Sequence, residues 1–423
     1  MTERLLQFIW QMQYYNKADL RTFSNESLSI THHGTLNLNQ GPDFKNASIK
    51  IDGTTWAGNI EVHIKASDWK AHGHGEDKNY DNIILHVVWE NDQPPTFMDR
   101  VVPVLVLQDR VSKLLLKRYE ELMYAQNIIP CESSVALVPE LVWKNWKTRL
   151  ATERLQRKTS KIETWLQQTN QHWEEVFWWM LAGNFGVTVN IKAFEAIARS
   201  IPVITLAKHK NQIHQLECFL LGQAGLLNAD FGEDYPKMLQ KEYRFYQKKY
   251  AFQPIYEPVH FLRMRPGNFP TIRLVQLAAL IKGASHLFAQ VRSATSLADI
   301  KKMFTVTAND YWHYHYRFDE PSLFREKVLG KQMINNIIIN TVIPSVFAYG
   351  KVHNDQSHKN KAIQWLEEIS PEQNSITNKW KVLDIANQSA LDSQALIELT
   401  KEYCLHKKCL HCAIGTAVLK RSQ

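Results

Sequence analysis

Asp43, Glu61, His63 and Lys65 have the residue types and the spacing that metal-assisted hydrolysis requires. Asp43 lies in a Gly-Pro-Asp-Phe turn, whereas Glu61, His63 and Lys65 alternate with Val and Ile. Residues two apart in a strand point to one face of a sheet, so these three side chains share a face. Two carboxylates hold a hard cation such as Mg²⁺ or Mn²⁺, and His or Lys transfers protons beside it. The pattern predicts a catalytic site made by these residues, with Asp43 and Glu61 binding the divalent cation.

A glycine-flanked loop supplies an alternative set of metal ligands. His72 and His74 are two residues apart in it, and His86 follows on the next predicted strand. Imidazole nitrogens suit Zn²⁺ and related transition metals, so His72, His74 and His86 predict a His-centred metal hydrolase of a small substrate. His63 or Asp77 would complete this set. A purely structural interpretation competes with both sites, because antiparallel sheets often leave one polar face in solvent.

Three cysteines crowd together near residue 410. Cys409 and Cys412 have the C-x2-C spacing of a metal knuckle, and Cys404 is a third candidate ligand. The candidates for the fourth ligand are Cys131, His406 and His411. Four thiolates accept either Zn²⁺ or an iron–sulfur cluster, so the pattern predicts one of these cofactors, and reduced, unliganded cysteines are the alternative.

Three arginines surround a Pro/Gly turn that opens a predicted helix. They are Arg263, Arg265 and Arg273. Guanidinium groups beside free helix N-terminal amides suit a phosphate, which predicts a nucleic-acid-binding site. An arginine network that pins the loop explains the same residues equally well.

Charge is distributed unevenly along the chain. The 423 residues include 50 Lys and Arg against 42 Asp and Glu, a net charge of +8. Residues 1–110 carry 10 basic and 14 acidic residues, whereas residues 111–423 carry 40 and 28. A basic remainder favours a polyanionic partner, and we expect nucleic acid, either DNA or RNA. The 44% hydrophobic and 11% aromatic content excludes a disordered chain.

The order of the predicted elements indicates an α+β protein. A helix over residues 3–15, capped by Thr2, precedes alternating segments at 27–31, 47–51, 58–65, 83–89 and 101–107. Asp52-Gly53 predicts a hairpin between two of these segments. Helical spacing then recurs at 114–124, 143–166, 173–183, 191–200, 212–221, 235–250, 271–281, 297–303, 330–345, 359–369 and 393–403.

These elements divide the chain into three predicted parts. Residues 1–112 form a mixed, largely antiparallel sheet with a leading helix, and residues 113–138 form a connection. Residues 139–423 form a large all-α domain that carries the Cys motif.

Pro42-Asp43, the hairpin and Glu61-x-His63 together resemble the motif of the PD-(D/E)XK nuclease superfamily. The resemblance covers only the first quarter of the chain and implies a restriction-endonuclease-like fold, in which a helix precedes a mixed sheet. It also implies that Asp43 and Glu61 bind Mg²⁺ or Mn²⁺. His63 stands where the superfamily has a lysine that activates water, and Lys65 is the implied substitute. Glu3 would match an extra acidic residue of some members.

The whole chain also resembles a family of conserved bacterial proteins without an assigned activity. The shared segments run from Gly41-Pro42-Asp43-Phe44 to Leu85-His86-Val87-Val88, and include Arg265-Pro266-x-Asn268-Phe269-Pro270 and Cys409-Leu410-x-Cys412-x-Ile414-Gly415. This resemblance implies no particular reaction.

The remaining signals concern the compartment. The first residues lack an apolar signal-peptide core, and no apolar run reaches 18 residues. We therefore expect a cytoplasmic protein without a membrane partner, and the oligomeric state is left open. The leading hypothesis is a metal-dependent nuclease or nuclease-like protein. The alternatives are a non-catalytic nucleic-acid-binding or scaffold protein and the His-centred hydrolase.

Overall fold

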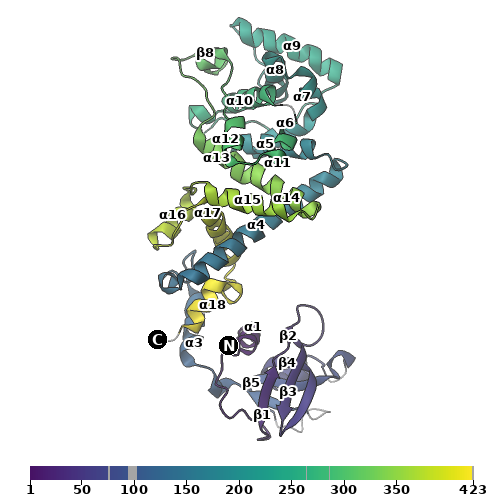
Figure 1. Cartoon of the computed structure of the whole chain (residues 1–423), viewed down its shortest axis with the longest axis vertical. Coiled ribbons are helices and arrows are strands. Elements are labelled where there is room, and N and C mark those ends of the chain that lie inside the picture. The colour runs from purple at the N-terminus through teal and green to yellow at the C-terminus, as the bar shows by residue number, and fades with distance from the viewer. Residues whose placement is uncertain (75–76, 94–101, 263, 285, 422–423) are drawn as a thin grey trace. The chain divides into compact units, whose positions relative to one another are not determined.

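The computed structural model describes residues 1–74, 77–93, 102–262, 264–284 and 286–421. These residues group into two compact units, which we call the sheet unit and the helical unit. The sheet unit is Met1–Trp146 with Leu399–Gln423, and the helical unit is Lys147–Glu398. The fold is α+β, as predicted: a mixed sheet with a leading helix comes first, and helices follow (Figure 1).

The leading helix α1 (Glu3–Met12) forms because its N-terminus is capped and one face is apolar. The Thr2 hydroxyl accepts a hydrogen bond from the backbone N–H of Leu5 at 3.2 Å, which confirms the predicted cap. Leu5, Leu6, Phe8, Ile9 and Trp10 are buried. Met12, the last residue of the helix, is 42% exposed. The helix packs against the central strand β4 (Thr54–Lys65), and this contact places its polar residue Gln7 beside Asp43.

The sheet has the order β1-β3-β4-β5-β6, with β2 paired to β3 (Figure 1). Its strands are β1 (Leu28–His32), β2 (Thr35–Leu36), β3 (Phe44–Ile51), β4 (Thr54–Lys65), β5 (Ile83–Glu90) and β6 (Val104–Val106). The predicted hairpin is confirmed: Asp52 and Gly53, both with positive φ, connect β3 to β4, and Ile51 faces Thr54. Part of the predicted last strand, Val101, lies outside the described residues.

The expectation of a largely antiparallel sheet is wrong for its second half. β4 pairs with β5 in parallel, and β5 pairs with β6 in parallel. Antiparallel neighbours can be joined by two residues, whereas parallel neighbours need a crossover. The chain makes this crossover through α2 (Asp68–Ala71), the loop after it and η1 (Lys78–Tyr80). The crossover carries the two loop histidines, so the parallel pairing is also what returns them to the sheet.

Both faces of β4 are buried near its C-terminal end. Ile60 and Val62 are fully buried on one face, and Glu61 and His63 are only 4% and 1% exposed on the other. Glu61 and His63 therefore do not lie on a polar sheet face exposed to solvent, which was the purely structural interpretation of these residues.

The C-terminal segment belongs to the sheet unit, unlike the predicted domain 139–423. Helix α18 (Ala413–Lys420) packs against α3 (Lys113–Tyr124) and against η4 (Val135–Leu137). The short elements η8 (Leu399–Cys404) and η9 (Cys409–His411) precede α18 in the same unit. The boundary between the units therefore falls within α4 (Glu140–Gln168) and again at Glu398, and not at residue 139.

The helical unit consists of helices and one short hairpin. Its helices are α5 (Trp173–Phe185), α6 (Ile191–Ser200), α7 (Val203–His209), α8 (Ile213–Gln223), α9 (Asp234–Tyr250), α10 (Pro270–Gly283), α11 (Leu287–Ser293), α12 (Leu297–Met303), α13 (Lys331–Ile337), α14 (Ile343–Val352), α15 (Gln356–Glu368), α16 (Ser375–Val382) and α17 (Ala390–Glu398). The remaining elements are η5 (Pro266–Asn268), η6 (Asp310–His313), η7 (Ile338–Val342), β7 (His315–Arg317) and β8 (Glu320–Pro321).

One long apolar helix forms part of the core of the helical unit. Within the described residues, the continuous helix Lys331–Val352 is long and apolar enough to cross a membrane, yet 78% of its apolar window is buried. A π-helical turn, η7, lies in its middle. Its apolar side chains are covered by neighbouring helices such as α15, which packs against α14.

Candidate functional site

Asp43 and Glu61 are held next to each other by reciprocal hydrogen bonds to the backbone. The backbone N–H of Asp43 donates to Glu61 Oε2 at 3.0 Å, and the backbone N–H of Val62 donates to Asp43 Oδ2 at 3.2 Å. Gln7 on α1 donates its amide N–H to the other oxygen of Asp43, Oδ1, at 2.9 Å. The structure therefore brings together the two carboxylates that the sequence separates by a hairpin.

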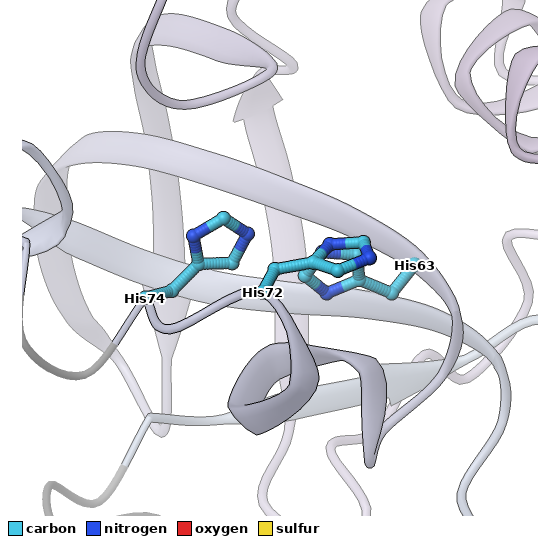
Figure 2. A group of neighbouring side chains, drawn as sticks. All are labelled: His63, His72 and His74. Atoms are coloured by element: carbon cyan, nitrogen blue, oxygen red, sulfur yellow. The ribbon is translucent and has the colours of Figure 1, made fainter.

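Three histidines gather at the same end of β4. His72 and His74 approach His63 from the loop that follows α2 (Figure 2). Each of the three offers a ring nitrogen, and these nitrogens lie within 4.8 Å of one another. Among the described residues, these three histidines are spaced closely enough to hold a metal ion together. The structure thus brings the two loop histidines together with His63, which is the buried member of the three.

The carboxylate and histidine sets form one site and not two. Glu61 Oε1 lies 3.5 Å from Nε2 of His63 and 3.4 Å from Nε2 of His74. Glu61 thus contacts Asp43 through one oxygen and two imidazoles through the other. Oxygen and nitrogen donors together suit a borderline transition metal such as Mn²⁺ or Zn²⁺ better than Mg²⁺, which prefers oxygen alone.

His86 stands behind His63 on the neighbouring strand. The parallel register pairs Glu61 with His86, and Nδ1 of His63 lies 2.9 Å from Nε2 of His86. His86 is fully buried, and its Nδ1 has no hydrogen-bond partner among the residues that the structure describes. His86 was predicted as a metal ligand, but it is not among the three closely spaced histidines. Its Nε2 faces His63 instead.

Burial dominates the electrostatics of the site. Burial, with the neighbouring negative charge as a second cause, raises the pKa of Asp43 to about 6 and that of Glu61 to about 8. Burial and the neighbouring imidazoles lower the pKa of His63 to about 2 and that of His86 to about 3. Both histidines are therefore neutral at physiological pH, which is the state in which imidazole binds a metal.

Two aromatic residues form the wall of the site. The Tyr80 ring stacks on His74 with centroids 3.9 Å apart, and Trp69 contacts the rings of His63, His74 and His86. These residues and Gln7 were not predicted from the sequence. In the sequence, nothing distinguishes Gln7 from other polar residues of an amphipathic helix, or Trp69 and Tyr80 from aromatic residues of the hydrophobic core.

Lys65 and Glu3 lie at the edge of this arrangement. Lys65 is exposed at the end of β4 and lies near Asp92, whose pKa is lowered because hydrogen bonds from Ser67 outweigh the effect of burial, with the charge of Lys65 as a smaller cause. Glu3 is connected to the site through Gln7, whose amide lies 3.3 Å from Glu3 Oε1, and its charge contributes to the raised pKa of Asp43. Asp77 caps η1 by accepting the backbone N–H of Asn79.

The four candidate cysteine ligands lie in the sheet unit and are buried. Cys131, Cys404, Cys409 and Cys412 are each 6–7% exposed and carry free thiols. Burial, and then the negative charge of the other thiolates, raises the pKa of Cys131 to about 12. The other candidates for the fourth ligand, His406 and His411, are exposed. Cys218 is buried in α8 of the helical unit.

The predicted phosphate-binding arginines differ in their environments. Arg265 is exposed just before η5. Arg273 is 8% exposed, and its guanidinium donates to Gln276 at 2.9 Å and to Asn268 at 2.5 Å. This burial disfavours direct phosphate binding by Arg273, because two of its N–H groups already serve its own helix and turn. Arg263 lies outside the described residues.

The fold and the site define an α+β protein with a buried cluster of carboxylates and imidazoles on a mixed sheet. A family model described as "Protein of unknown function (DUF2851)" matches residues 3–375, and the chain belongs to this family. No curated protein and no solved structure matches the chain.

Proposed function

We propose that this protein is a metal-dependent hydrolase that cleaves phosphodiester bonds in nucleic acid. The reaction would take place at the cluster of Asp43, Glu61, His63, His72 and His74, which we call the Glu61 site. The observation that carries the proposal is the position of Glu61, which contacts Asp43 through one carboxylate oxygen and His63 and His74 through the other. A divalent ion bound by such a set lowers the pKa of a water molecule and neutralises charge on a phosphate.

The residues divide into ligands and a proton-transfer group. Asp43 and Glu61 supply oxygen ligands, as the resemblance to the PD-(D/E)XK superfamily implies, and His63 and His74 supply nitrogens on the opposite side of Glu61. His72 is the exposed member of the three histidines, so solvent and substrate reach it first. We therefore assign His72 to proton transfer and His63, which is buried and neutral, to metal binding.

The charge of the chain supports a polyanionic substrate. Residues 111–423 carry 40 basic against 28 acidic residues, and exposed basic groups attract a phosphate backbone. The five free thiols are consistent with the cytoplasm, where the reducing environment keeps cysteines unpaired. DNA and RNA offer the same phosphodiester group and are separate arms of the test.

The test is cleavage of single-stranded DNA, duplex DNA and RNA with Mn²⁺, Mg²⁺ or Zn²⁺ added to metal-depleted protein. We expect Mn²⁺-dependent cleavage that falls at least about 100-fold in Glu61→Gln and in Asp43→Asn. Glu90→Gln is the matched control, because Glu90 is exposed at the end of the adjacent strand β5. Cleavage that survives Glu61→Gln, or that is absent with all three metals, would contradict the proposal.

The close spacing of His63, His72 and His74 favours a second candidate, a Zn²⁺-dependent hydrolase of a small substrate. Its signature is Zn²⁺-dependent hydrolysis of a small phosphate or carboxylate ester without cleavage of any polymer. If this second candidate is correct, His72 is a metal ligand, so His72→Ala should lose Zn²⁺. The phosphodiesterase proposal predicts instead that His72→Ala keeps its metal and cleaves nucleic acid more slowly.

A further inference from the structure

The strongest feature outside the Glu61 site is the group of four buried cysteines in the sheet unit. Cys131 follows α3, Cys404 ends η8, Cys409 begins η9 and Cys412 caps α18. The whole helical unit, Lys147–Glu398, separates Cys131 from the other three in sequence. We propose that these four cysteines form one four-thiolate metal site, which fastens the C-terminal segment to the first part of the chain.

The packing of the surrounding elements supports a common site. α18 packs against η4, which lies just after Cys131, and η8 packs against η9. These two contacts bring the segment of Cys131 to the start of α18, and the segment of Cys404 to Cys409. Lys407, between Cys404 and Cys409, donates from Nζ to the carbonyl of Met123 at the end of α3, at 2.5 Å. The C-terminal turn is therefore anchored beside the part of the chain that supplies the fourth thiol.

The turn between Cys409 and Cys412 has the form of a metal knuckle. The backbone N–H of Cys412 donates to the carbonyl of Cys409 at 3.3 Å, which closes the turn. The backbone N–H groups of Gly415 and Ile414 form hydrogen bonds to the Cys412 sulfur. Amides directed at a sulfur stabilise its thiolate form, which is the form that binds metal.

Gly415 allows the start of α18 to approach this turn closely. A Cβ atom on Gly415 would lie 2.4 Å from the carbonyl oxygen of Cys409, so no other residue fits without moving the turn. The close approach holds the Cys412 end of α18 against Cys409.

The spacing of the sulfurs favours a cluster over a single zinc ion. A tetrahedral zinc ion with Zn–S distances of about 2.3 Å holds its sulfurs about 3.8 Å apart. Among the described residues, the three histidines and not the cysteines bring donor atoms within 4.8 Å of one another. An iron–sulfur cluster gives each thiolate its own iron atom and accepts a wider set. We therefore expect iron and inorganic sulfide at this site.

The experiment uses the full chain, purified without oxygen, with iron, acid-labile sulfide and zinc measured per chain. We expect a brown protein whose iron and sulfide fall at least tenfold in Cys409→Ser and in Cys131→Ser. Cys218→Ser is the matched control and retains the metal, because Cys218 lies in the helical unit. One zinc per chain with the same cysteine dependence supports the four-thiolate site and overturns the cluster.

A second measurement does not depend on the folding of variants. Titration of the wild-type protein with p-hydroxymercuribenzoate, which caps thiols, should release the metal in step with modification. Limited proteolysis should then cut the segment after Glu398, which the metal no longer fastens. A wild-type protein with neither iron nor zinc, or serine variants that retain full metal content, would overturn the proposal. Neither outcome depends on whether the Glu61 site cleaves nucleic acid.

Discussion

Nδ1 of His63 lies 2.9 Å from Nε2 of His86, so one of these two neutral rings must donate its N–H to the other. If His86 donates, Nε2 of His63 carries a proton and faces Glu61. If His63 donates, its Nε2 presents a lone pair to a metal. The buried Nδ1 of His86 has no hydrogen-bond partner among the described residues. In the first arrangement this nitrogen is an unpaired acceptor, and in the second it is an unpaired N–H. Because an unpaired acceptor costs less, metal-free protein favours the first arrangement. Metal binding through Nε2 of His63 would therefore change the tautomer of both rings: Nε2 of His63 would lose its proton, the shared proton would move to Nδ1 of His63, and Nδ1 of His86 would gain a proton.

The first prediction concerns this pair. His86→Phe removes the group that orients His63 and fixes its tautomer, while all the proposed ligands remain. We expect Mn²⁺ affinity to fall about 10–100-fold, as measured by calorimetry. His214→Gln in the helical unit is the control and leaves the affinity unchanged. An affinity unchanged in His86→Phe would show that the contact does not orient a ligand.

The second prediction concerns stability and pH. Burial raises the pKa of Asp43 to about 6 and of Glu61 to about 8, so the folded state retains protons that the unfolded chain has released. The contribution of these two carboxyl groups to the free energy of unfolding of metal-free protein therefore falls as pH rises from about 4 to about 8. Glu61→Gln removes the larger part of this slope and should stabilise metal-free protein at pH 8 by about 1–3 kcal/mol.

Urea unfolding at pH 5 and pH 8 measures this difference. The wild type and Glu61→Gln should be similar at pH 5 and diverge at pH 8. Below about pH 6.5 the two neutral histidines have the opposite effect: their pKa values are lowered to about 2 and about 3, so stability is lost as the unfolded chain takes up protons. Parallel curves for the two proteins across this range would contradict a protonated Glu61.

Part of the site follows from the sequence, and the rest depends on tertiary pairing. The two-residue period of a strand places Glu61 and His63 on one face, and a tight turn such as Asp52-Gly53 accounts for the approach of Asp43. The parallel register that sets Glu61 opposite His86 is not encoded in any local pattern. The same is true of the contact from Gln7, because only the packing of α1 on β4 brings it to Asp43.

The third prediction separates the two arginines. Arg273→Gln leaves the buried Gln276 and the partly buried Asn268 without their donor, so it should lower the free energy of unfolding by about 1–3 kcal/mol. It should not change the salt dependence of nucleic-acid binding. The exposed Arg265→Gln should do the reverse: stability is retained, and the slope of log K against log salt falls by about 1 if Arg265 contacts a phosphate. Fluorescence anisotropy over a salt series measures both slopes.

The fourth prediction concerns helix packing. A Cβ atom on Gly222 in α8 would lie 2.1 Å from the ring of Tyr243 in α9, which is held by its hydroxyl on Gln223 at 3.0 Å. Gly222→Ala must push these helices apart and should destabilise the helical unit by about 1–3 kcal/mol. Gly283→Ala at the end of α10 meets nothing within 4 Å and should be neutral or slightly stabilising. Equal melting temperatures for the two variants would contradict this packing.

The sheet unit is interrupted in sequence by the helical unit, and this has a consequence for synthesis. During translation α3 and the segment of Cys131 leave the ribosome long before η9 and α18 exist. While the helices of Lys147–Glu398 are made, the surface of the nascent sheet unit that α18 later covers therefore remains exposed. A chain released before η9 and α18 are made would have a complete helical unit and an unfinished sheet unit, so the sheet unit can close only after the whole helical unit has been made.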